Sequence, residues 1–271
     1  MKKAIPVLLL VALLMGCGGS SPSAPSNAAT SEQHKSPFAG TPGYILQFHN
    51  DFRSGMNAVD ESGISVAIAM DVSGSMGDAP QAGGEPKYIQ ATKALRTVAG
   101  YLEDMASKLK DMKIRVCILR FNNQVDLVLP LTTLDADGIA KLNAAINPRN
   151  FSPNGGTAIG RAMEIESEIL AESGTVFNSL MVVTDGENNV NPDPEDVMKA
   201  IYSNRNNMTT EDFQVMTSTQ MSSFIGFDVR SRQFERFKEL GARVASANSQ
   251  AEIEQGLKSF LEADIKNLES K

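Results

Sequence analysis

The sequence contains no tryptophan, and its 271 residues include only two cysteines and two histidines. The cysteines are Cys17 and Cys117, and both histidines, His34 and His49, lie in the N-terminal fifth of the chain. Zinc and copper sites are built mainly from these two residue types, so neither metal is favoured. The scarcity of histidine also disfavours a catalytic site that depends on an imidazole base.

Basic residues are fewer than acidic ones, with 25 lysines and arginines against 32 aspartates and glutamates, a formal charge of −7. Removal of Lys2 and Lys3 with an N-terminal signal would take the charge to −9. Excess negative charge repels phosphate backbones, so nucleic acid is not an expected partner. A cationic ligand or a metal ion is more compatible with this negative charge.

A long apolar run is also missing, because the stretch from Ala4 to Met15 is too short to span a bilayer permanently. It follows two lysines and precedes Gly16-Cys17, which is the layout of a secretory signal. The residues Leu14-Met15-Gly16-Cys17 resemble a bacterial lipobox, which implies a lipoprotein signal peptide over residues 1–16 and an acylated, membrane-anchoring Cys17. Gly18 differs from the aspartate of an inner-membrane retention signal, so the expected location is the bacterial outer membrane.

Residues 17–43 are rich in Ser, Pro, Gly and Ala and have almost no large apolar side chain. Such a composition cannot bury enough surface to order itself, so this segment is expected to be a flexible tether. Residues 44–271 are long enough for one domain, with a core from about 62 to 265. With Cys17 acylated, Cys117 has no cysteine left to pair with inside the chain, and its apolar neighbours predict a buried, inert thiol.

Short apolar runs in this domain predict strands, and apolar residues at three- and four-residue steps predict helices. Residues 44–62 are expected to form a short helix or strand at the edge of the domain. The predicted strands are 64–70, 114–121, 125–129, 179–184, 224–227 and 243–247, and the predicted helices are 88–109, 134–146, 159–170, 193–202, 234–240 and 253–268.

Strands that alternate with helices predict a mainly parallel, six-stranded, Rossmann-like α/β sandwich with helices on both faces of the sheet. The loop Asn122-Asn123 is short enough only for a hairpin, so the third strand should be antiparallel. In the order 3-2-1-4-5-6, the first and fourth strands are neighbours where the winding reverses, which is where such folds bind ligands. Asp71 ends the first strand and Asp185 ends the fourth.

Three short motifs carry the chemistry expected at that point. Asp71-Val-Ser73-Gly-Ser75 places a carboxylate and two hydroxyls on alternate residues, and Gly155-Gly-Thr157 and Thr184-Asp185-Gly186 add further oxygens. Oxygen donors of this kind suit Mg²⁺ or Mn²⁺. The alternative is a turn of Ser and Asp that caps a helix and binds no metal.

Together these motifs resemble the von Willebrand factor type A domain with its metal-ion-dependent adhesion site. The resemblance covers about residues 62–265 and implies a metal held directly by Ser73 and Ser75, and by Thr157 when a ligand is bound. It further implies that Asp71 and Asp185 act mainly through water.

A metal surrounded mainly by neutral oxygens keeps much of its positive charge and seeks an anionic ligand. The expected partner is therefore a protein that presents an Asp or Glu, with Met76 and Glu187 at a possible contact rim around the site. This hypothesis describes a protein-binding module in adhesion or in assembly of an envelope complex. In the alternative, the protein is a scaffold or accessory subunit whose metal only stabilises the loops.

An enzyme is the least favoured interpretation. Haloacid-dehalogenase-type phosphatases have Asp-x-Asp at this strand end, whereas the second position here is Ser73. The residues Ser73 to Gly77 also differ from the Gly-x-Ser-x-Gly motif of serine hydrolases. No catalytic residue is predicted.

Overall fold

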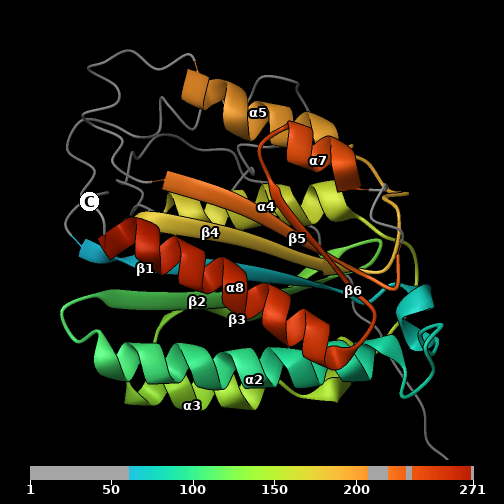
Figure 1. Cartoon of the computed structure of the whole chain (residues 1–271), viewed down its shortest axis with the longest axis horizontal. Helices are drawn as coiled ribbons and strands as arrows, with labels where there is room; N and C mark the ends of the chain where they lie inside the picture. The colour runs from blue at the N-terminus through green and yellow to red at the C-terminus, as the bar shows by residue number, and fades with distance from the viewer. Residues whose placement is uncertain (1–60, 207–218, 230–233, 270–271) are drawn as a thin grey trace, which may run out of the picture. The chain divides into compact units, whose positions relative to one another are not determined.

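The computed structural model describes residues 61–206, 219–229 and 234–269, with side chains undescribed at a few element ends. The tether, Cys17 and the segment 44–60 lie outside these ranges. Within them the chain forms one six-stranded sheet with the order β3-β2-β1-β4-β5-β6, as predicted (Figure 1). The strands are β1 (Glu61–Asp71), β2 (Lys113–Phe121), β3 (Val125–Thr133), β4 (Thr175–Thr184), β5 (Thr219–Phe227) and β6 (Arg243–Ala247).

The pairing of the strands also agrees with the prediction. β1 runs parallel to β2 on one side and to β4 on the other, β5 and β6 continue the parallel order, and only β3 is antiparallel. Residues from Ile64 to Met70 on β1 are all at most 1% exposed. A strand covered on both faces needs this continuous apolar sequence.

Helices cover both faces of the sheet (Figure 1). One face packs against α2 and α8, with α3 beside α2, around a core that includes Leu95, Ile118 and Leu257. The other packs against α4, α5 and α7 around Leu119 and Phe224. The helices are α2 (Lys87–Lys108), α3 (Ala136–Ala145), α4 (Ile159–Ala171), α5 (Pro194–Asn206), α7 (Glu235–Glu239) and α8 (Gln250–Glu269), with 3₁₀ turns η1 (Gly74–Gly77) and η2 (Pro148–Phe151).

Strand β4 begins at Thr175, four residues before the predicted start at Ser179. The polar residues of its first half conceal the strand, because their side chains are satisfied inside the protein. Asn178 accepts a hydrogen bond from Ser173, and the Ser179 hydroxyl donates to Asp264 on α8 at 2.7 Å. Buried polar residues such as Thr175 and Asn178 therefore interrupt the apolar run from which the strand was predicted.

Two further features bear on sequence predictions. Cys117 is fully buried on β2, and burial raises the pKa of its thiol, as expected for an unreactive cysteine. None of the helices within the described ranges has the length and apolar character needed to cross a membrane.

A buried carboxyl group on α4 makes stability depend on pH. Glu166 is 0% exposed, and burial raises its pKa well above the ordinary value, although backbone groups of Ala69 and Met181 partly oppose this. In the unfolded chain, a glutamate side chain has its ordinary pKa of about 4.3. Protonated Glu166 therefore makes its full contribution to the free energy of unfolding below about pH 4.3, and this contribution is lost as the pH rises toward the pKa of the folded state.

Glu166→Gln keeps the shape of the side chain but cannot ionise. We therefore expect this variant not to lose stability at this position as the pH rises. The difference in free energy of unfolding between variant and wild type should increase with pH above about 4.3, by at most about 1.4 kcal/mol per pH unit. Urea unfolding at a series of pH values measures it, with the exposed Glu103→Gln on α2 as the control. A difference that stays constant from pH 4 to 8 would contradict the prediction.

Candidate functional site

The three predicted motifs lie together at the carboxyl edge of the sheet. Asp71 is the last residue of β1, and η1 follows it with Ser73 at its N-cap. β4, the neighbour of β1, ends at Thr184 and leads directly into Asp185. The loop of Gly155 reaches the same place, because the Gly74 N–H donates to the Gly155 carbonyl at 3.0 Å.

Asp71 organises this turn from within the protein. It is 1% exposed, and its Oδ1 accepts the Ser73 N–H at 2.7 Å while its Oδ2 accepts the Thr184 hydroxyl at 2.5 Å. Burial, with a smaller contribution from the neighbouring Asp185, raises the pKa of Asp71 to about 6, although these hydrogen bonds act to lower it. A cation next to this carboxylate would offset the cost of burying its charge.

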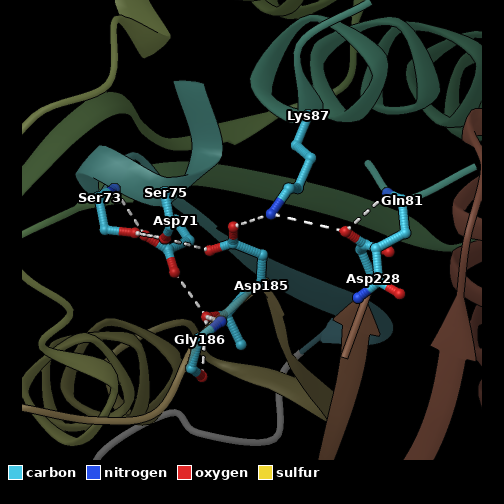
Figure 2. Close-up of polar contacts among 9 residues, drawn as sticks. Asp71, Ser73, Ser75, Gln81, Lys87, Asp185, Gly186 and Asp228 are labelled. Atoms are coloured by element: carbon cyan, nitrogen blue, oxygen red, sulfur yellow. Dashed lines mark hydrogen bonds and ion pairs between the residues drawn. The ribbon is translucent and has the colours of Figure 1, made fainter. Parts of the chain in front are cut away.

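The two serine hydroxyls point toward the same spot (Figure 2). Ser73 Oγ lies 3.1 Å from Ser75 Oγ, and the Ser75 hydroxyl donates to Asp185 Oδ1 at 2.8 Å. Ser73 is buried, whereas Ser75 is exposed and therefore accessible from solvent. The result is a row of oxygens from Ser73 to Asp185 that is open on one side.

Thr157 is held beside this row by asparagine side chains. Its N–H donates to Asn189 Oδ1 at 2.8 Å, and its carbonyl accepts the Asn189 N–H at 3.0 Å. Asn123 accepts the Gly156 N–H at 2.7 Å from the other side. The Thr157 hydroxyl lies next to Gly186, only 3.6 Å from where a Cβ would stand on that glycine. All five predicted ligand residues are thus gathered at one place.

The oxygens fit a small divalent cation. Adjacent ligands of an octahedral Mg²⁺ with bonds of about 2.1 Å lie about 3.0 Å apart, close to the 3.1 Å between the two serine hydroxyls. The described residues contain no group of three or more His, Cys, Asp and Glu side chains arranged to hold a metal. A cation here would therefore depend on hydroxyls, and zinc or copper would not be favoured.

Met76 was placed at a possible contact rim, with packing in the core as an equally open alternative, and the structure shows the core packing. It is 0% exposed and packs in the core beneath η1, because this turn directs its one large apolar side chain inward. Glu187, the other predicted rim residue, is exposed.

Sequence reasoning missed several residues that shape the site. Asn123 was read only as part of a hairpin loop, and Asn189 as part of a solvated loop, yet both hold the segment around Thr157. Lys87 was also missed: its ammonium group donates to Asp185 Oδ2 at 2.7 Å. Asp228, after β5, lies 3.7 Å from the same ammonium group. Asp228 ends the segment Phe224-Ile-Gly-Phe-Asp228, which is part of the family resemblance, whereas no local motif marks the other three residues.

Comparison with known proteins agrees with this architecture. The family model of the von Willebrand factor type A domain matches residues 65–240. No curated protein matches the sequence. The PilB minor pilin from Streptococcus sanguinis has a similar fold, with a TM-score of 0.56, 15% identity, and coverage of 78% of this chain and 62% of the pilin.

Two other solved structures share the fold at similarly low identity. The open conformation of the pilus adhesin SpaC from Lactobacillus rhamnosus GG gives a TM-score of 0.55 at 13% identity, covering 76% of this chain and 30% of SpaC. The corresponding domain of the type V pili tip protein Mfa5 from Porphyromonas gingivalis gives 0.50 at 14% identity, covering 75% of this chain and 97% of that one. This chain thus corresponds to less than two thirds of the pilin and less than one third of SpaC. Because the family model spans most of the sheet described above, the chain belongs to the von Willebrand factor type A domain family.

Proposed function

We propose that this protein is a metal-dependent protein-binding module that captures a carboxylate of its partner through Mg²⁺ or Mn²⁺. The observation that carries the proposal is the continuous set of oxygens at the carboxyl edge of β1 and β4. Ser73, Ser75 and Asp185 are joined through contacts of 3.1 and 2.8 Å, and Ser75 is an exposed residue.

Each residue has a distinct role in this proposal. Ser73, Ser75 and Thr157 would hold the metal directly, and Asp71 and Asp185 would accept hydrogen bonds from its water ligands. The bound cation would supply an electrophilic position that favours an anionic oxygen. Neutral hydroxyls leave its charge largely uncompensated, so a partner's Asp or Glu binds better than a neutral side chain.

The proposed setting is adhesion or complex assembly in the bacterial cell envelope. Three proteins that share the fold are a minor pilin, a pilus adhesin and a pilus tip protein, which supports a protein partner and an envelope location. We propose that residues 1–16 are removed as a signal peptide, that Cys17 carries the lipid anchor in the outer membrane, and that residues 17–43 form the tether. Mass spectrometry of the N-terminal peptide tests this, and an unmodified Cys17 in membrane-extracted protein would rule it out.

A scaffold role, with a metal that only stabilises the loops, is the alternative. Catalysis has little support, because both histidines precede β1 and the second position of the first motif is Ser73 rather than an acid.

The test is capture of partners from envelope extract by the purified protein, with Mg²⁺ present or with excess chelator. We expect specific partners to be retained with Mg²⁺ and lost with chelator. Retention that is equal in both conditions would favour the scaffold. If excess chelator does not reduce partner retention, the proposal of metal-dependent capture is overturned, and the fold assignment is unaffected.

A further inference from the structure

One buried cation stands next to the proposed metal ligands. Lys87 is the first residue of α2, and its side chain is 10% exposed. Figure 2 shows the side chain extending from the helix to a position between two carboxylates. Its ammonium nitrogen lies 2.7 Å from Asp185 Oδ2 and 3.7 Å from Asp228 Oδ2.

Two contributions to stability oppose a lysine at this position, apart from its ion pairs. The N-terminal turn of a helix carries partial positive charge and favours acids, yet the first turn of α2 contains none. Burying an ammonium group adds a desolvation cost that an ion pair often only offsets. Departures from such local rules concentrate at functional sites. The arrangement therefore indicates a role at the neighbouring site.

Asp228 holds the lysine from the side opposite Asp185. Its Oδ2 also accepts the Gln81 N–H at 3.1 Å, which ties the loop after η1 to the end of β5. Asp228 has a φ of 58°, a left-handed backbone conformation that is unusual for a residue other than glycine. The ammonium group is thus fixed in place from two sides.

Each carboxylate oxygen of Asp185 therefore accepts a hydrogen bond from a different residue. Oδ1 faces Ser75, and Oδ2 is occupied by Lys87. The lysine therefore fixes the rotation of this carboxylate and neutralises part of its charge. A divalent cation beside Ser75 would meet a less anionic site, with a further positive charge close by.

We propose that Lys87 is a positioning residue that acts as a fixed counter-charge: it weakens binding of the metal alone and strengthens capture of a carboxylate by the metal-loaded site. This inference rests on the proposed function. The repulsion between lysine and metal lowers metal affinity, and both positive charges attract the incoming anion. The two consequences have opposite signs, which a purely structural role would not produce.

The test uses the purified full chain, Mn²⁺ as the metal and acetate as the carboxylate probe. Electron paramagnetic resonance of free Mn²⁺ gives the metal affinity, and its change on adding acetate gives the coupling between metal and anion. For Lys87→Met we expect about three- to tenfold tighter Mn²⁺ binding and a smaller enhancement by acetate. Lys87→Gln, which keeps a donor for Asp185 but loses the charge, should change both quantities in the same direction.

Lys93→Met is the matched control. Lys93 lies on the same helix and pairs with Glu85 of the preceding loop, but its side chain is 48% exposed. Removing its charge should change neither quantity by more than about twofold, because solvent screens exposed charges. Added Mn²⁺ should also raise the melting temperature of Lys87→Met more than that of wild type, which provides a second readout if the variant is less stable.

The outcomes separate this inference from the proposed function. If the wild type binds no Mn²⁺ even with acetate, both fail. If the wild type binds Mn²⁺ with acetate coupling and the Lys87 variants bind equally or more weakly, only the counter-charge role fails. Tighter metal binding with reduced acetate coupling in both Lys87 variants, and not in Lys93→Met, supports it.

Discussion

Replacing Ser75 with alanine is expected to abolish metal-dependent capture of the partner while leaving the fold intact. The substitution removes one direct ligand of the proposed metal and the hydrogen bond to Asp185. Loss of groups that only orient a metal ligand costs about 10- to 100-fold in affinity, so loss of a ligand should cost at least that much. The affinity for Mn²⁺ in the presence of acetate measures it.

The stability of this variant should change little. Ser75 is exposed, and its one hydrogen bond to Asp185 contributes about 1 kcal/mol. Thr157→Ala should weaken capture similarly, because it removes another proposed ligand of the metal. The loop should stay in place, because hydrogen bonds between the Thr157 backbone and Asn189 fix it, and the hydroxyl does not.

Ser152→Ala is the matched control, since Ser152 is an exposed serine in the segment that leads to this loop. Capture should be unchanged in the control. Full capture by Ser75→Ala or Thr157→Ala would leave the scaffold as the better description of the protein.

Gly160→Ala is expected to destabilise the protein by about 2 to 4 kcal/mol. Gly160 lies in the first turn of α4, and a Cβ there would stand 2.1 Å from the Pro192 carbonyl oxygen and 2.8 Å from its carbonyl carbon. These are backbone atoms, so they cannot rotate away. The helix and the segment around Pro192 would have to separate.

The same change should weaken metal-dependent capture. The segment that Gly160 contacts continues from Asn189, which positions Thr157. Displacing it would misplace a proposed ligand without altering any predicted ligand residue.

Gly100→Ala on α2 is the control, because no atom beyond the neighbouring residues and the backbone of its own helix lies within 4 Å of the added Cβ. Alanine favours a helix more than glycine does, so this variant should be more stable by about 0.5 to 1 kcal/mol. Denaturant unfolding compares the two. A Gly160→Ala protein as stable as wild type would mean that α4 and Pro192 are not in close contact.

The sequence predicted those parts of the fold in which local pattern and burial agree. β1 is mostly apolar along its buried length, and β6 was placed with the correct bounds. The strand order and the position of Asp71 beside β4 could therefore be inferred. The start of β4 was missed, because the buried polar residues Thr175 and Asn178, which are satisfied by hydrogen bonds inside the protein, interrupt its apolar sequence.

The same distinction applies to the candidate site. The five oxygen-bearing residues lie in short motifs, and a motif is a local signal. Lys87 is 98 residues from Asp185, and its neighbours in sequence give no sign that its ammonium group turns inward. The place of Met76 was left open for a related reason: whether one apolar residue of a short turn faces the partner or the core depends on what packs beneath it.

The central position of β1 has a mechanical consequence. The strand runs from Glu61 to Asp71, so its first residue lies at the edge of the sheet opposite the candidate site. If the protein is anchored before β1 and holds its partner beyond Asp71, a pulling force acts along this one strand. β1 has parallel neighbours on both sides, and the hydrogen bonds to β2 and β4 would be loaded together in shear. They would share the load rather than open one after another.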